Sequence, residues 1–365
     1  MLCLVVAYHW FWEPVEARAP RVRLSPELWR TPTTNEVDME LTDRTKLAFL
    51  IVAGCIVTTG SSVAQSYPSK PIRLIVPFSP GGTTDTIARL VAREMTTALG
   101  ESVVVENRPG AGGLIGAEAV LKLPADGYTL ALATISTLAV KPIVQKKPSY
   151  DPLNDFTPVT QIAKLPYILA AHPSLPVRSL PQLVKLARAN PASIAYASPG
   201  YGTGAHLSAE YLSGTTGMKL VHVPYKGDGP GTIDLVAGQV EIALFPPISL
   251  LPHVKSGRLR ALAVTSLERS SVLPDTRTVA ESGFPGFESG SWNGIAVRAG
   301  TPETIVQRLF GVIVNVLTQS KQVRANIESS GARVVANTPQ QFGDYVRGEI
   351  EKWRRVIATA GIKID

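Results

Sequence analysis

Short apolar runs and amphipathic stretches alternate along residues 67–365. Unbroken apolar runs predict buried strands, whereas apolar positions three and four residues apart predict helices. The first set of elements comprises predicted strands at 72–76, 102–106 and 128–134 and predicted helices at 84–99 and 114–123. Gly100 ends the first of these helices, and a turn over residues 77–82 precedes it. This alternation predicts an α/β fold with a mostly parallel sheet that helices cover on both faces.

A second set of alternating elements follows the first. The pattern predicts strands at 167–171, 194–197, 219–223, 241–245 and 261–265 and helices at 180–189, 205–214 and 231–237. The chain then returns with a strand at 294–297 and helices at 302–318, 321–330 and 339–360. Because each set has its own strands and helices, and the chain is long enough for two cores, we expect two α/β lobes.

One motif occurs in both sets. The first strand is followed by Ser79-Pro80-Gly81-Gly82-Thr83-Thr84, and a strand of the second set by Ser198-Pro199-Gly200-Tyr201-Gly202-Thr203; each motif opens a helix. Free N–H groups and the dipole at a helix start favour anions, glycine permits close approach, and hydroxyl groups add donors. We therefore expect both lobes to close on one anionic ligand. Such turns also serve simply to close a βα unit, and Asp85 suits helix capping as well as ligand contact.

The composition favours an anionic ligand without indicating nucleic acid binding. The 365 residues carry 36 Lys and Arg against 29 Asp and Glu, and the net charge of +7 is spread along the chain rather than gathered in basic runs. The two cysteines exclude a disulfide scaffold and form no CxxC pair that would indicate a zinc site.

Motifs for catalysis are absent from the sequence. Residues 200–205 fit the relaxed dinucleotide pattern G-x-G-x-x-A, but the next predicted strand ends in Val223-Pro224-Tyr225-Lys226 and offers no acid for a ribose. No G-x-S-x-G, Walker A or H-E-x-x-H pattern occurs, and the histidines after residue 64 are not at metal-ligand spacing. We expect no catalytic residue, no metal and no cofactor. An enzyme that acts on a carboxylate is an alternative without a recognisable nucleophile–base pair.

The N-terminal residues have the pattern of an export signal. Charged residues after Met39, then an apolar run and small residues before the cleavage point, predict a signal peptide at 39–64, cut after Ala64. Translation is then expected to start at Met39, and residues 1–38 are interpreted as a non-native extension; the alternative is a small ordered extension.

A lipoprotein is the alternative to a freely exported protein. Val52-Ala53-Gly54-Cys55 resembles a lipobox, which would make Cys55 an acylated membrane anchor. The apolar run before Cys55 is short and continues past it, which favours ordinary cleavage. Because no apolar stretch reaches the ~20 residues that span a bilayer, we expect a soluble periplasmic protein.

Several segments together resemble one protein family. The matching segments are Tyr67–Gly82, Glu106–Gly113, Ala125–Tyr128, Tyr150–Phe156, Tyr196–Gly200, His206-Leu207, Val223–Gly227, Arg260–Ser266, Leu273–Asp275, Lys352-Trp353 and Ala360–Lys363. They are similar to the Bug (TctC-type) proteins, the extracytoplasmic solute-binding components of tripartite tricarboxylate transporters. The resemblance covers residues 67–365.

The resemblance implies a type II periplasmic binding protein fold, a Venus flytrap of two α/β lobes joined by a hinge. The chain is expected to cross between lobes near Pro166 and near Ser291, which assigns 65–166 and 291–365 to lobe 1 and 167–290 to lobe 2. The family implies a monomer that binds a small carboxylate and delivers it to a membrane permease of the tripartite tricarboxylate type. A sensor kinase is the alternative partner.

The resemblance also implies which residues hold the ligand. The expected ligand-binding residues are Ser79, Gly81, Gly82, Thr83, Thr84, Asp85, Thr134, Ser136 and Thr137 in lobe 1, and Ser198, Gly202, Thr203, His206, Tyr225 and Lys226 in lobe 2. Two departures from the family pattern bear on the ligand. Tyr201 is bulkier than in many relatives, and Phe245-Pro246 stands where many carry Asp-Asn. Since an acid there can meet a cationic group, we expect a purely anionic or aromatic acid rather than an amino acid.

Overall fold

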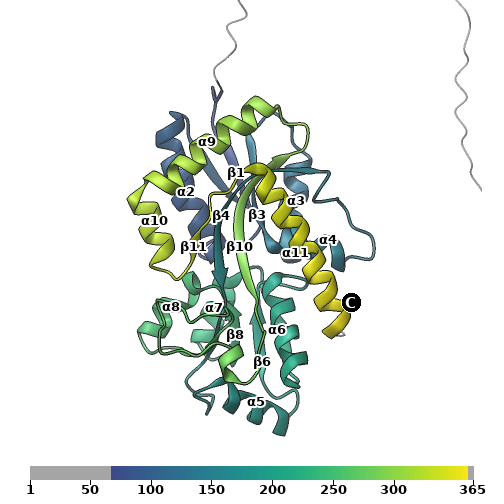
Figure 1. The fold of residues 1–365 in the computed structure, drawn as a ribbon, viewed down its shortest axis with the longest axis vertical. Helices are drawn as coiled ribbons and strands as arrows, with labels where there is room; N and C mark the ends of the chain where they lie inside the picture. Colours follow the sequence, from purple (N-terminus) through teal and green to yellow (C-terminus); the bar gives the residue numbers. More distant parts are fainter. Residues whose placement is uncertain (1–66, 361–365) are drawn as a thin grey trace, which may run out of the picture. The chain divides into compact units, whose positions relative to one another are not determined.

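The computed structural model describes residues 67–360, so the expected signal peptide and N-terminal extension lie outside the described residues (Figure 1). Its strands are β1 (Ile72–Val76), β2 (Val103–Asn107), β3 (Thr129–Thr134), β4 (Phe156–Pro166), β5 (Ile168–Ala171), β6 (Ala195–Ser198), β7 (Val221–Pro224), β8 (Ile242–Phe245), β9 (Arg260–Val264), β10 (Gly290–Arg298) and β11 (Arg333–Val334). Its α-helices are α2 (Thr83–Leu99), α3 (Leu114–Leu121), α4 (Lys141–Val144), α5 (Leu180–Ala189), α6 (Gly204–Thr216), α7 (Asp228–Val236), α8 (Pro247–Lys255), α9 (Glu303–Gln319), α10 (Lys321–Glu328) and α11 (Pro339–Ala360). Shorter turns of helix are η2 (Ala111–Gly113), η3 (Ser136–Val140) and η4 (Ala280–Ser282).

Two mixed sheets organise these elements, and the predicted α/β class is confirmed. The first sheet has the order β11-β4-β10-β3-β1-β2, and the second has the order β7-β6-β8-β5-β9. The βαβ units pair in parallel, as predicted: β1 with β2 and β3, and β6 with β7 and β8. The prediction of a mostly parallel first sheet is wrong, because β10 runs antiparallel to β3 and β4, and β11 runs antiparallel to β4.

The chain passes from one sheet to the other at two places. At the first place, β4 of the first sheet ends at Pro166, and β5 of the second sheet begins two residues later at Ile168, with Tyr167 between them. The return runs from β9 through residues 265–289 to β10, which pairs with β4 along its length (Figure 1). The division into two lobes at these crossings stays a prediction.

Local sequence explains the β1–α2 unit. Only Arg73 is exposed in β1, as expected for a strand covered on both faces. The buried face of α2 carries Ile87, Val91 and Met95 at intervals of four residues. Gly100 ends the helix in the left-handed conformation at φ 75°, and its N–H donates to the Thr96 carbonyl.

Two substantial elements were not predicted. β4 was missed because its apolar positions are interrupted by polar ones and it contains Pro158, which lies beside a register shift in its pairing with β10. α8 was missed because it begins at Pro247 and contains Pro252, a residue that normally ends helical patterns. In both elements, prolines therefore obscure the hydrophobic pattern from which strands and helices are predicted.

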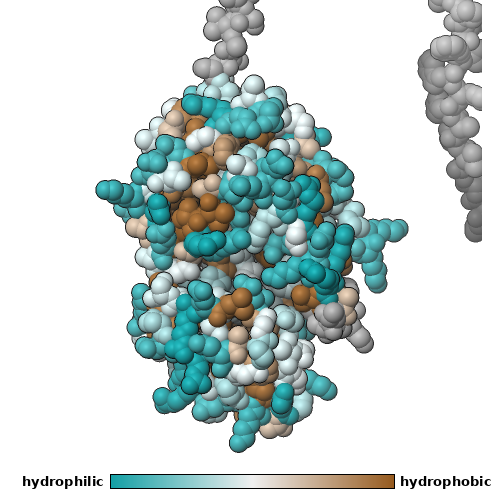
Figure 2. All heavy atoms as spheres, in the orientation of Figure 1, coloured by the Kyte–Doolittle hydropathy of each residue, from teal (hydrophilic) through white to brown (hydrophobic). Residues whose placement is uncertain are grey.

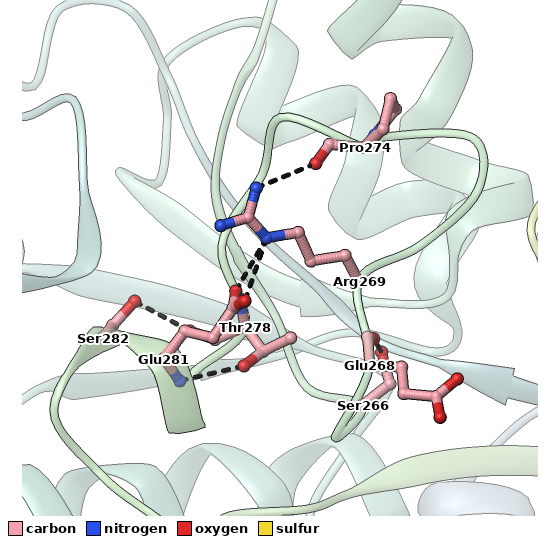
Figure 3. A network of polar contacts seen from close by, with 7 residues as sticks. All are labelled: Ser266, Glu268, Arg269, Pro274, Thr278, Glu281 and Ser282. Atoms are coloured by element: carbon pink, nitrogen blue, oxygen red, sulfur yellow. Dashed lines mark hydrogen bonds and ion pairs between the residues drawn. The ribbon is translucent and has the colours of Figure 1, made fainter.

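A polar network orders the return segment between β9 and β10 (Figure 3). Glu281 N–H donates to Thr278 Oγ1 at 3.0 Å, and Thr278 N–H donates to Glu281 Oε2 at 2.9 Å, which is a reciprocal capping box. Arg269 Nε donates to the same carboxylate at 2.9 Å, and its Nη1 donates to the Pro274 carbonyl at 3.2 Å. Thr278 also forms a bridge with Val264 of β9, so the network fixes this segment to the second sheet.

The visible face of residues 67–360 is largely hydrophilic, with separate apolar patches rather than one continuous apolar face (Figure 2). Among the helices that the structure describes, none combines the length and apolar character that crossing a membrane requires.

Candidate functional site

The first glycine-rich turn joins β1 to α2 and is held by Asp85. Asp85 Oδ2 accepts the Gly81 N–H at 3.0 Å and Arg89 Nε at 2.9 Å, and its Oδ1 accepts Asn107 Nδ2 at 2.9 Å. Burial alone would raise the pKa of Asp85, but the hydrogen bonds from Arg89, Gly81 and Asn107 outweigh it and lower that pKa. Position 81 requires glycine because its φ of 82° lies in the left-handed region, which other residues rarely adopt. The carboxylate of Asp85 therefore builds the turn.

The second turn, between β6 and α6, is built from hydrogen bonds within the loop. Thr203 is the N-cap of α6: its Oγ1 accepts the His206 N–H at 3.3 Å and donates to the Gly200 carbonyl at 2.8 Å. Ser198 Oγ accepts the Gly200 N–H at 3.0 Å. Gly202 has φ 62°, and its N–H donates to His206 Nδ1 at 3.2 Å.

At the start of α2 and at the start of α6, a backbone N–H donates a hydrogen bond to a side-chain oxygen from an element that packs on the other sheet. Both carboxylate oxygens of Asp228, the first residue of α7, accept the Thr83 N–H, at 3.2 and 3.1 Å. In the other direction, Ser136 Oγ of η3 accepts the Gly204 N–H at 3.2 Å. At each of the two anion-binding positions predicted from the sequence, one backbone N–H is therefore already bonded to a group of the protein itself.

A small cavity of about 30 Å³ lies between these helix starts. Its lining combines residues of both halves: Phe78, Thr84, Thr134, Ser136, Tyr167, Pro199, Thr203, Ala205, Asp228, Pro246 and Ser291. Four of the expected ligand-binding residues are among them, namely Thr84, Thr134, Ser136 and Thr203. Sites for small ligands measure ~300 Å³ or more, whereas a cavity of ~10–15 Å³ already holds one water. In this arrangement the cleft is closed.

Further expected ligand-binding residues, which do not line the cavity, bond to neighbours around it, and Thr137 does so through the cavity residue Thr134. Thr134 and Thr137 bond each other reciprocally, with Thr137 N–H donating to Thr134 Oγ1 at 3.2 Å and Thr134 N–H donating to Thr137 Oγ1 at 3.1 Å. The Lys226 side chain is exposed, but its carbonyl accepts the Ser79 N–H at 2.9 Å and so links the two halves. Tyr225 directs its hydroxyl to Asp234 Oδ2 at 2.8 Å, and burial, with that carboxylate, raises the pKa of Tyr225 to about 12.

His206 belongs to a stack of rings beneath the second turn. Its ring lies 4.2 Å from that of His222 at an interplanar angle of 28°, and His222 in turn stacks on Tyr196 at 4.9 Å. His222 Nε2 is 2.6 Å from Ser198 Oγ. Burial, followed by the effects of His222 and Lys141, lowers the pKa of His206 to about 3, and burial lowers that of His222 to about 4. Both rings are neutral near pH 7 and brace the turn.

Sequence reasoning missed Asp228, Tyr167 and Ser291. The helix predicted at 231–237 leaves Asp228 outside it, whereas α7 begins three residues earlier, at Asp228. An acid directly after Val223–Gly227 was the available sign, since acidic residues favour the first turn of a helix. Although position 246 carries proline, the cleft does contain an acid, and that acid is Asp228.

A buried cation lies beside the second turn. The Lys141 ammonium group lies close to Gly112 and Gly202, where a Cβ at either glycine would be 3.0 or 3.2 Å from its Nζ. Burial lowers the pKa of Lys141, and no ion pair to it is found among residues 67–360. Within the same residues, no cluster of His, Cys, Asp and Glu has the makings of a metal site.

Comparison with known proteins gives a consistent result. Residues 87–362 match the family described as the tripartite tricarboxylate transporter family receptor, TctC. Protein BugT of Bordetella pertussis is 38% identical over 320 residues, which cover 86% of this chain and 98% of BugT. These matches confirm the resemblance predicted from the sequence motifs.

Two solved structures from Rhodopseudomonas palustris are also similar. Rpa4515, solved with adipate, gives a TM-score of 0.78 at 38% identity and covers 81% of this chain and 99% of its own. MatC (Rpa3494), solved with bound malate, gives a TM-score of 0.77 at 32% identity and covers 80% of this chain and all of its own (100%). Both of those proteins were solved with a dicarboxylic acid.

Proposed function

Because the chain belongs to the TctC (Bug) family of periplasmic solute-binding proteins, which is not a family of enzymes, we propose that it captures a small organic acid between its two sheets. The acid's carboxylate binds at the N-terminus of α2, and groups at the start of α6 close over it from the other side. The protein is exported by the signal peptide at 39–64, acts as a monomer of two lobes, and delivers its ligand to a permease of the tripartite tricarboxylate type.

The carboxylate of Asp228 carries this proposal. It is held at the start of α2, so this turn accepts a carboxylate in the molecule itself. The Thr83 hydroxyl at the same turn is buried and has no hydrogen-bond partner among the described residues, so it offers a further donor to a ligand. The similarity to proteins solved with adipate and malate supports the same class of ligand.

The affinity expected for such a site is adequate for a binding protein. Charge-assisted hydrogen bonds contribute ~1.5–3 kcal/mol each, and a micromolar dissociation constant requires ~8 kcal/mol. Four or five donors on one carboxylate therefore suffice after the cost of closing the cleft. Because the ligand contacts both halves only when they are closed, binding shifts the balance between open and closed forms.

Thermal unfolding with a panel of mono-, di- and tricarboxylates, aromatic acids and amino acids tests the proposal. A ligand at 100 times its dissociation constant stabilises the folded protein by ~2.7 kcal/mol, which raises the melting temperature measurably. The best ligand is then titrated calorimetrically into Thr83→Val, which keeps the backbone N–H and removes the hydroxyl. We expect affinity to fall about tenfold.

Thr86→Val is the matched control. Thr86 lies on the first turns of the same helix, but it is exposed and its hydroxyl donates to the Gly82 carbonyl at 3.0 Å. This change is expected to leave affinity within about twofold of the wild type. A panel in which amino acids bind and simple carboxylates do not would contradict the proposed ligand class.

A further inference from the structure

Asp228 is an acid whose side-chain partner lies on the opposite side of the cleft. It is 5% exposed, and its carboxylate accepts the N–H of Thr83, a residue 145 positions away in the chain. Asp228 begins α7, which packs on the second sheet, whereas Thr83 begins α2, which packs on the first. No ion pair to Asp228 is present among the residues that the structure describes.

The fit of this carboxylate leaves no room for a second one. A Cβ added at Gly82, the N-cap of α2, would lie 2.2 Å from Asp228 Oδ1, so only glycine permits this approach. The cavity that remains between the halves is about 30 Å³, roughly a tenth of the ~300 Å³ at which sites for small ligands begin. The Thr83 N–H, which would serve a ligand carboxylate, is already in use.

We propose that Asp228 is an internal competitor of the ligand: its carboxylate occupies the start of α2 in the closed, ligand-free protein and must leave for a ligand carboxylate to bind. This inference rests on the proposed function and adds a residue that sets affinity and selectivity. The ligand exchanges one carboxylate for another at the same donors, so it gains less than it would at a vacant helix start. The same contact stabilises the closed form when no ligand is present.

The competition also affects which ligands are favoured. Two carboxylates at one short turn repel each other, so Asp228 must withdraw before an acid can bind. Neutral compounds that cannot replace a carboxylate at the Thr83 N–H have no means of displacing it. Asp228 therefore prevents binding of weak, non-ionic ligands. It lowers the affinity for carboxylic acids without preventing their binding.

Calorimetric titration of adipate, malate and the best acid from the panel into Asp228→Asn tests the inference. Asparagine keeps the size of the side chain and removes its charge, and a neutral acceptor bonds an N–H about half as strongly as a carboxylate does. We expect Asp228→Asn to bind the acid about tenfold more tightly than the wild type. Asp228→Ser, which also shortens the side chain, is expected to change affinity in the same direction and guards against a defect peculiar to asparagine.

Asp275→Asn is the control for the change in net charge, because Asp275 is exposed on the return segment and distant in sequence from both turns. It is expected to bind like the wild type. Small-angle scattering of the ligand-free proteins supplies a second readout, with Asp228→Asn more expanded than the wild type.

The outcomes separate this inference from the proposed function. If the wild type binds an acid and both Asp228 variants bind it equally or less tightly, Asp228 is a ligand contact or a bystander and the inference is wrong. If neither the wild type nor the variants bind any acid, the proposed function fails and the inference fails with it.

Discussion

The paired histidines beneath the second turn predict that the protein loses stability in mild acid. The unfolded chain takes up protons on His206 and His222 near the ordinary pKa of ~6.5, whereas the folded protein resists until the pH approaches 4 for His222 and 3 for His206. Because both pKa values are lowered by folding, their contribution to stability is complete above pH ~6.5 and is lost as the pH falls toward the folded values. Each pH unit in this window costs ~1.4 kcal/mol for one fully shifted group.

At pH ~5.0 the expected loss from His206 is therefore ~2 kcal/mol, and the less buried His222 adds a smaller amount. Urea unfolding at pH 7.5 and 5.0 measures it as a lower midpoint at an unchanged slope. The lowered pKa of Asp85 contributes in a different range, since its stabilisation is lost only in stronger acid, below the ordinary carboxyl pKa of ~4.

The double variant His206→Asn, His222→Asn separates this effect from general acid sensitivity. It is expected to be less stable than the wild type at pH 7.5, because the ring stack is lost. On going to pH 5.0 it is expected to lose less than the wild type by ~2 kcal/mol for His206 plus the smaller amount for His222. His172→Asn, which changes a histidine whose ring Nδ1 bonds nearby Ser174, is expected to keep the wild-type response. Equal losses in the wild type and the double variant would refute the reasoning.

Two further predictions concern the groups beside the turns. Asp85→Asn is expected to lower the free energy of unfolding by ~1–3 kcal/mol in urea at neutral pH, because charge-assisted bonds at the start of α2 are lost; Asp344→Asn, which breaks an exposed ion pair, should cost under ~0.5 kcal/mol. Lys141→Met is expected to leave the melting temperature unchanged or raise it, because a buried cation is removed, whereas exposed Lys146→Met should have no effect. A marked loss in Lys141→Met would reveal a partner for that cation.

The turns could be predicted from the sequence because their chemistry is local. Gly81 and Gly82 follow a strand and precede an amphipathic helix, which the structure begins at Thr83. Asp85 lies four residues from Gly81 and from Arg89, so its capping role was open to prediction as well. Hydrogen bonds over such short separations depend on helix geometry alone.

The groups that fill the turns could not be predicted because they come from distant parts of the chain. Ser136 bonds Gly204 across 68 residues, and these partners meet only after both sheets have formed. A strand at 294–297, within β10, could be predicted, but its antiparallel pairing with β4 could not, since that pairing also joins segments far apart in the chain. No periodicity in a single segment records either contact.

The two helix starts are filled unequally, and this difference has a consequence for binding. The start of α6 receives a neutral hydroxyl from Ser136, whereas the start of α2 receives the charged group of Asp228. A carboxylate ligand therefore displaces little at α6 but must compete at α2. When only a fraction of the molecules can bind the ligand, the apparent dissociation constant rises in inverse proportion to that fraction. If Asp228 occupies its site in about nine molecules of ten, the apparent dissociation constant rises about tenfold, which is the gain in affinity expected when its charge is removed.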